Sequence, residues 1–143
     1  GAISDVKLKE NIADASSQWD DIKAVKVRNY NFKEETGNPT HTQIGVVAQE
    51  IETVSPGLVY ETPDRETVEV PILDQNGEAV LDENGKAKVT TEDRNTGTVT
   101  KSVNYSVLYM KAIKALQEAQ TRIETLETQN ADLLARVTAL EAA

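Results

Sequence analysis

Arg122-Ile123-Glu124-Thr125-Leu126-Glu127, together with the related stretch Arg136-Val137-Thr138-Ala139-Leu140-Glu141, decides how this chain folds. Both stretches lie in a tract from about Tyr109 to Leu140 whose apolar residues recur every seven residues, as in a coiled coil. The a positions of this heptad repeat hold Tyr109, Leu116, Ile123, Asn130 and Val137, and the d positions hold Ala112, Ala119, Leu126, Leu133 and Leu140. The repeat therefore predicts a long C-terminal coiled-coil helix, in which a buried Asn130 costs stability but fixes the register.

The same two stretches indicate the number of helices in the coiled coil. Each has Arg at g, apolar residues at a and d, and Glu at e, a pattern that favours parallel trimers. In such a trimer Arg122 and Arg136 reach Glu127 and Glu141 of the neighbouring helix and cover the core with their aliphatic stems. Asn130 taken alone favours a dimer, but two consecutive matches favour a homotrimer. Its expected interface is Leu116, Arg122, Ile123, Leu126, Glu127, Asn130, Leu133, Arg136, Val137, Leu140 and Glu141.

Residues 61–101 have the composition of a β-hairpin arm. Val and Thr alternate with charged residues, and the eight-residue unit Leu73–Ala79 recurs as Leu81–Ala87. Each unit contains Asn-Gly, which predicts a tight type I′ turn with positive φ at both central residues. The acidic turns lack the ligand spacing of a calcium loop, so we expect no metal there. A solvated surface insertion is the other interpretation of this segment.

The first 60 residues predict a small α+β body. Residues 24–32 and 43–47 have the β-branched and aromatic content of two strands, with a turn at 34–42 between them. Residues 48–52 then predict a short helix that ends near Ser55-Pro56-Gly57. The whole chain, residues 1–143, is expected to form one domain: the body with its N-terminal site (1–60), the arm (61–101) and the C-terminal helix (102–143).

Composition limits the possible partners. The formal net charge is −9, which repels a phosphate backbone, so we expect no nucleic-acid partner. No apolar run is long enough for a membrane span, and there is no cysteine for disulfides or thiolate metal sites. The 38% hydrophobic content is low for a self-sufficient core, which favours an obligate oligomer. No cofactor is expected.

Four stretches of the chain together carry a family resemblance. They are Ser4–Ile12, Tyr30–Phe32, Gln43–Ile51 and Val103–Leu108. In order and type they resemble the C-terminal intramolecular chaperone domains of phage tail fibres, endosialidase tailspikes and neck appendages, also called the peptidase S74 family. The resemblance extends over nearly the whole chain apart from residues 61–100.

The resemblance implies a self-cleaving Ser-Lys dyad. It assigns Ser4 as the nucleophile and Lys9 as its general base, and it places the scissile bond next to Ser4, with Ser4-Asp5 the favoured bond. A serine hydroxyl needs such a base, and a lysine can serve only when burial or nearby cations lower its pKa. Asp5 would position or strain the bond. The residues alone favour a different interpretation, with Ser4-Asp5 as a helix N-cap and Lys9 as a solvated side chain.

The expected function is therefore an intramolecular chaperone that trimerises and folds an upstream phage tail fibre or tailspike, then releases itself. It would be a single-turnover serine endopeptidase without external substrates, acting in the host cytoplasm during virion assembly and absent from the mature virion once cleaved. One alternative is a trimerisation or receptor-binding tip that stays attached without proteolysis. Another is the cleavage module of a membrane-tethered eukaryotic regulator, in which the same domain type occurs.

Overall fold

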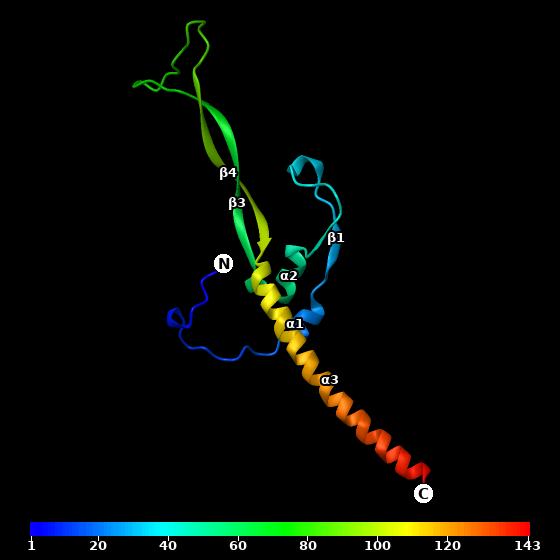
Figure 1. Ribbon diagram of the computed structural model, residues 1–143. Helices are drawn as coiled ribbons and strands as arrows, with labels where there is room; N and C mark the ends of the chain where they lie inside the picture. Colours follow the sequence, from blue (N-terminus) through cyan, green and yellow to red (C-terminus); the bar gives the residue numbers. More distant parts are fainter. The chain divides into compact units, whose positions relative to one another are not determined.

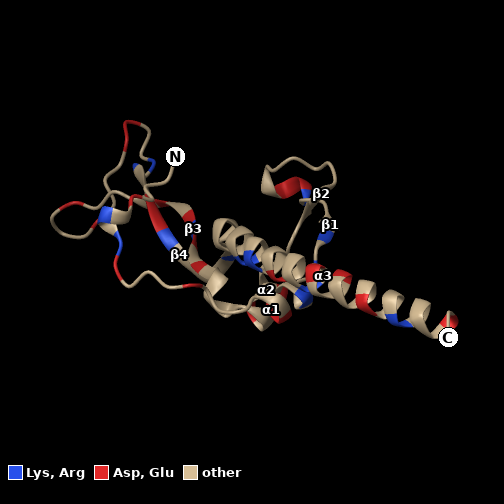
Figure 2. Ribbon diagram, turned by 60° about the horizontal axis from the view of Figure 1, so that its bottom comes forward, with Lys and Arg blue, Asp and Glu red and all other residues tan.

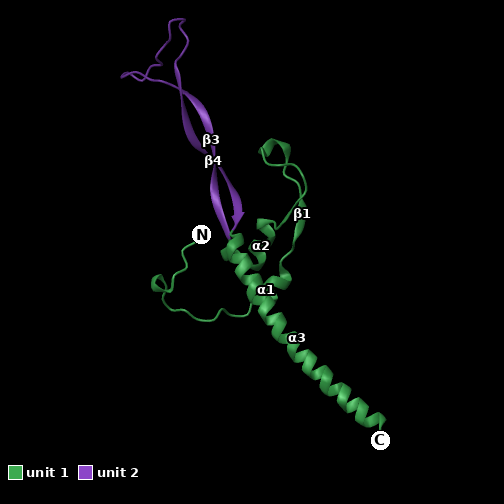
Figure 3. Ribbon diagram, in the orientation of Figure 1, with its two compact units in different colours: residues 1–58, 104–143 green, residues 59–103 purple.

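The computed structural model describes residues 1–143 and divides the chain into two compact units (Figure 3). Unit 1 contains residues 1–58 and 104–143, and unit 2 contains residues 59–103. Along the chain the elements are η1 (Val6–Leu8), α1 (Trp19–Ala24), β1 (Arg28–Tyr30), η2 (Glu34–Thr36), β2 (Gln43–Gly45), α2 (Ala48–Val54), η3 (Pro56–Leu58), β3 (Val59–Pro71), β4 (Val89–Val103) and α3 (Tyr105–Glu141), as Figure 1 shows. None of the helices has the length and apolar composition of a membrane span.

Unit 1 contains a short antiparallel pair, β1 and β2, in which Arg28 lies opposite Gly45. The predicted strands 24–32 and 43–47 are thus correct in position but too long. At Gly45 a Cβ atom would lie 2.7 Å from the Tyr105 hydroxyl, so only glycine allows this close approach. That hydroxyl accepts a hydrogen bond from the backbone N–H of Val46 at 3.1 Å. The first turn of α3 is therefore joined to the end of β2.

Arg28 and Glu50 connect β1 to α2. The Arg28 guanidinium donates from Nε and from one terminal nitrogen to the two Glu50 carboxylate oxygens, at 3.0 and 2.6 Å. This paired geometry is the strongest arrangement of an arginine with a carboxylate. The hydrogen bond from Arg28 lowers the pKa of the Glu50 carboxyl. Helix α2 covers residues 48–54, two residues more than the predicted 48–52.

The core of unit 1 is small. Its buried apolar side chains are Ile51, Leu58, Leu108 and Ala115, and Ile51 is the only large side chain that is almost completely enclosed. The large apolar residues along the C-terminal part of α3 are instead about half exposed or more, from 48% for Val137 to 75% for Leu140. A single chain therefore leaves a long apolar helix surface uncovered.

Helix α3 runs without a break through 37 residues, a length of about 55 Å. Asn104 caps its N-terminus, since the side-chain oxygen accepts hydrogen bonds from the Ser106 hydroxyl at 2.7 Å and the Val107 N–H at 3.4 Å. The predicted C-terminal helix is thus present and begins at Tyr105. Figure 2 shows acidic and basic residues interspersed along it.

Unit 2 is a two-stranded antiparallel hairpin made of β3 and β4. The register shifts between Pro63 and Arg65, where Asp64 lies opposite the Thr96-Gly97-Thr98 bulge and Gly97 takes a φ of 88°. The Asp64 carboxylate accepts hydrogen bonds from the hydroxyls of Thr98 and Thr100, both at 2.6 Å. These two hydrogen bonds lower the pKa of the Asp64 carboxyl, and the bond from Thr100 has the larger effect.

The two repeats of unit 2 form turns, but not the predicted type I′ turns. Gly77 and Gly85 have positive φ, whereas the preceding Asn76 and Asn84 do not. The reason is local: the Asp74 carboxylate accepts the N–H groups of Asn76 and Glu78, and Asp82 does the same one repeat later. This Asx arrangement is typical of turns with ordinary φ values, followed here by a left-handed glycine.

Candidate active site

Ser4 and Lys9 are brought together by the single turn of η1. The turn is closed by two backbone hydrogen bonds of 3.1 Å, from Leu8 N–H to the Asp5 carbonyl and from Lys9 N–H to the Val6 carbonyl. At its end Lys9 Nζ donates a hydrogen bond to Ser4 Oγ at 2.7 Å. The two side chains predicted as a dyad are therefore in direct contact, and their catalytic roles stay a prediction.

Asp5 is the N-cap of η1. Its Oδ1 accepts a hydrogen bond from the backbone N–H of Lys7 at 3.0 Å, and its Oδ2 lies 3.5 Å from Lys7 Nζ. The structure thus places the N-cap at Asp5 and not at Ser4, whose hydroxyl contacts Lys9 instead. Just beyond Lys9, Asn11 has a φ of 53°, in the left-handed region that Asn enters more readily than most residues.

The surroundings of the Ser4–Lys9 pair are open to solvent. Both residues are exposed. The neighbouring apolar side chains are exposed as well, at 83% for Ile3, 69% for Val6 and 65% for Leu8. In the single chain the Ser4–Lys9 pair therefore lies among exposed apolar side chains.

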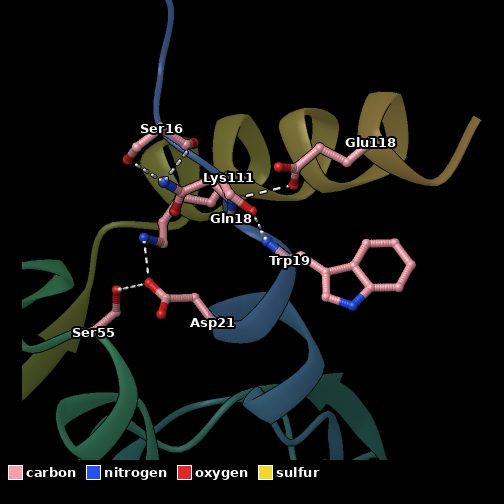
Figure 4. Close-up of polar contacts among 8 residues, drawn as sticks. Ser16, Gln18, Trp19, Asp21, Ser55, Lys111 and Glu118 are labelled. Carbon is pink, nitrogen blue, oxygen red and sulfur yellow. Dashed lines mark hydrogen bonds and ion pairs between the residues drawn. The ribbon is translucent and has the colours of Figure 1, made fainter. Parts of the chain in front are cut away.

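A second polar cluster joins α1 to α3 (Figure 4). Asp21 Oδ2 accepts hydrogen bonds from Lys111 Nζ at 2.8 Å and from the Ser55 hydroxyl at 3.2 Å. The hydrogen bond from Lys111 is the main reason that the pKa of the Asp21 carboxyl is lowered. Nearby, the Gln18 N–H donates to Glu118 Oε2 at 3.2 Å. No local sequence pattern predicts this cluster, because Asp21 and Lys111 are 90 positions apart.

Beside this cluster lies an open, largely apolar groove of about 360 Å³. The residues that line this groove include Gln18, Ser55, Met110 and Lys111. The buried Oε1 atom of Gln18 has no hydrogen-bond partner. The cluster joins α1 to Ser55 and to the start of α3, and neither the cluster nor the groove contains Ser4 or Lys9.

The predicted seam residues share one face of α3. One shallow groove on this helix, of about 460 Å³, is lined by Ile123, Leu126, Glu127, Gln129, Asn130 and Leu133. Another groove, of about 320 Å³, lies beside Trp19 and is lined by Ala112, Leu116 and Ala119. The guanidinium of Arg122 lies over the Trp19 ring of its own chain, so the predicted pairing of Arg122 with a neighbouring Glu127 stays a prediction.

Comparisons with known proteins agree with the resemblance inferred from the sequence. Residues 4–60 match the Peptidase S74 family model, described as chaperone of endosialidase. That segment starts at Ser4 and includes Lys9 and the whole β1–β2–α2 region. None of the curated proteins matches this chain.

One solved structure with a similar fold is the carboxy-terminal domain of the bacteriophage T5 L-shaped tail fibre with its intramolecular chaperone domain. The TM-score is 0.58 at 17% sequence identity, over 87% of the present chain. The chain spans 31% of the length of that tail-fibre chain. At this identity the likeness concerns the fold.

Proposed function

We propose that this chain, whose residues 4–60 match the Peptidase S74 family model (chaperone of endosialidase), is an intramolecular chaperone that releases itself by autoproteolysis. Its client would be the upstream part of a phage tail fibre or tailspike polypeptide. The observation that carries the proposal is the hydrogen bond between Lys9 Nζ and Ser4 Oγ at the start of the family segment. A chain of this kind cuts once and turns over no external substrate.

The proposed reaction begins when Lys9, in its neutral form, takes the proton of the Ser4 hydroxyl. The Ser4 oxygen attacks a peptide carbonyl carbon, the carbon–nitrogen bond breaks, and the departing nitrogen takes a proton from Lys9. Water then hydrolyses the resulting ester and regenerates the hydroxyl. This is the logic of a serine nucleophile with a lysine base.

Two peptide bonds flank Ser4, and they place different demands on the nucleophile. Attack on the Ile3 carbonyl by the hydroxyl of the same residue closes a five-membered ring, which is easily formed. Attack on the Ser4 carbonyl by its own hydroxyl would close a strained four-membered ring. A cut at Ser4-Asp5, the bond that the family resemblance favours, therefore requires the hydroxyl of a second copy. The masses of the products distinguish the two bonds.

Activation would depend on assembly. A lysine becomes an effective base only when its ammonium form is disfavoured by burial or by neighbouring cations. Lys9 and the apolar residues around it are exposed in the single chain, so their cover must come from other copies or from the folded client. Cleavage would then follow folding and not precede it.

Trimerisation through α3 would supply the chaperone activity. The apolar face around Ile123, Leu126 and Leu133 is exposed along the helix and fits a parallel homotrimer. Three copies held in this way keep three client chains in register at a high effective concentration. Assembly would take place in the host cytoplasm, and the cleaved domain would be absent from the mature virion.

The proposal is tested by expressing this chain behind its natural upstream sequence and weighing the products by intact mass spectrometry. A cut next to Ser4 that is absent in Ser4→Ala and Lys9→Ala supports it. If this parent polypeptide, the chain with its upstream sequence, stays uncut and forms a folded trimer, the result would instead support a permanently attached trimerisation or receptor-binding tip.

A further inference from the structure

We propose that Asp5 is a positioning residue for the reaction at Ser4, because its carboxylate caps the turn that brings Lys9 back to the nucleophile. This inference rests on the proposed function and concerns the same site. Asp5 would act through the backbone of η1 and not through its charge.

The spacing of Ser4 and Lys9 makes such a turn necessary. In an extended chain, residues five positions apart are separated by about 16 Å, and their side chains point to opposite faces. In the structure the Lys9 Nζ and Ser4 Oγ atoms are 2.7 Å apart. The contact therefore exists only while the chain between them is turned.

The turn itself has little to hold it. Helix η1 comprises three residues, Val6–Leu8, none of which is buried. A 3₁₀ turn of this length gains two backbone hydrogen bonds, and its first N–H groups have no partner within the turn. Asp5 Oδ1 supplies one by accepting from the Lys7 N–H at 3.0 Å. Loss of the cap would let the turn open and separate Lys9 from Ser4.

A role for the Asp5 charge has weaker support. The one ion pair of Asp5, with Lys7 at 3.5 Å, joins side chains that are 49% and 74% exposed. Pairs of this kind contribute little in water. The backbone contact, in contrast, is independent of the charge, because an Asn side chain caps a helix about as well as Asp.

Two substitutions separate the cap from the charge in the full parent chain with its upstream sequence. Asp5→Asn keeps a capping oxygen at the same position and removes the charge. Asp5→Glu keeps the charge and moves the carboxylate one methylene too far. Asp5→Ala removes both, and Lys7→Ala is the control, because it deletes the ion pair and leaves the backbone N–H in place.

We expect the cleavage rate of Asp5→Asn to stay within about threefold of the parent rate. Asp5→Glu and Asp5→Ala should cleave at least about fivefold more slowly than the parent, as loss of a cap predicts. The pH profile of cleavage should keep its midpoint in Asp5→Asn, and Lys7→Ala should cleave normally. Light scattering on each variant confirms that its oligomeric state is unchanged.

Two results would overturn the inference. In the first, Asp5→Asn cleaves as slowly as Asp5→Ala and its pH profile of cleavage is displaced. In the second, all three Asp5 variants cleave as fast as the parent. Failure of the proposed function looks different, since the parent would then remain uncut or Ser4→Ala would still be cut.

Discussion

The guanidinium carbon of Arg122 lies 3.9 Å from the centre of the Trp19 ring of the same chain. This cation–π contact joins the first residue of α1 to the middle of α3. It also gives a within-chain role to a residue that the heptad pattern assigns to the interface between chains.

Replacing Arg122 with Ala should remove this stack and lower the free energy of unfolding by about 0.5–1 kcal/mol. Trp19 is the only tryptophan, so its fluorescence emission reports the change directly. Arg136→Ala is the matched control, because Arg136 occupies the equivalent heptad position two heptads later. Equal emission changes in both variants would show that Arg122 has no special contact with Trp19.

The Asp21–Lys111 bond should make stability depend on pH in acid. The folded pKa of Asp21 is lowered, so its contribution is present above the unfolded pKa of about 3.9 and is lost as pH falls through the folded value. Because 41% of the Asp21 side chain is exposed, solvent screening keeps the effect modest.

Denaturant unfolding of the parent and of Asp21→Asn measures this effect. At pH 7 the variant should be less stable than the parent, and the difference should shrink below about pH 4. A difference that stays constant from pH 7 to acid would refute the role of the charged carboxylate.

Gly45→Ala should destabilise the protein by about 1–3 kcal/mol, the usual cost of overfilling a tight site. The new Cβ atom would lie 2.7 Å from the Tyr105 hydroxyl. Adding Tyr105→Phe removes that oxygen and should recover part of the loss in thermal unfolding. Gly57→Ala is the control, since nothing lies within 4 Å of its Cβ position. Equal effects at Gly45 and Gly57 would contradict the explanation.

The seam of α3 predicts a difference between two adjacent leucines. Leu133 lies at a d position and Leu134 does not, although the two are 54% and 67% exposed in the single chain. Leu133→Asp should dissociate the proposed trimer, because a charge at a core position is costly, whereas Leu134→Asp should leave that trimer intact. Analytical ultracentrifugation distinguishes these outcomes. Dissociation by both variants or by neither would count against this seam.

The sequence predicted best the elements that rest on a long periodic pattern. Heptads sustained from Tyr109 to Leu140 define α3, and the alternation in residues 61–101 predicts the β3–β4 hairpin. The family motif also named Ser4 and Lys9, which the structure brings into contact.

Details set by side chains were harder to predict. The Asn-Gly pairs suggested type I′ turns, but the Asp74 and Asp82 carboxylates bind the turn backbone and select another geometry. The strand predicted at 24–32 is shorter because only residues 28–30 pair with β2. The contacts of Asp21 with Lys111, and of Gly45 with Tyr105, join distant segments and leave no local pattern.

Lys9→Arg tests the proposed self-release most directly. Arginine keeps the positive charge and can donate a hydrogen bond to Ser4, but it does not give up its proton in proteins and cannot act as the base. The measurement is the intact mass of the parent polypeptide after assembly, with and without this substitution. We expect the parent polypeptide to be cut next to Ser4 and the Lys9→Arg polypeptide to remain whole. Cleavage of Lys9→Arg at the parent rate would show that Lys9 is not the base.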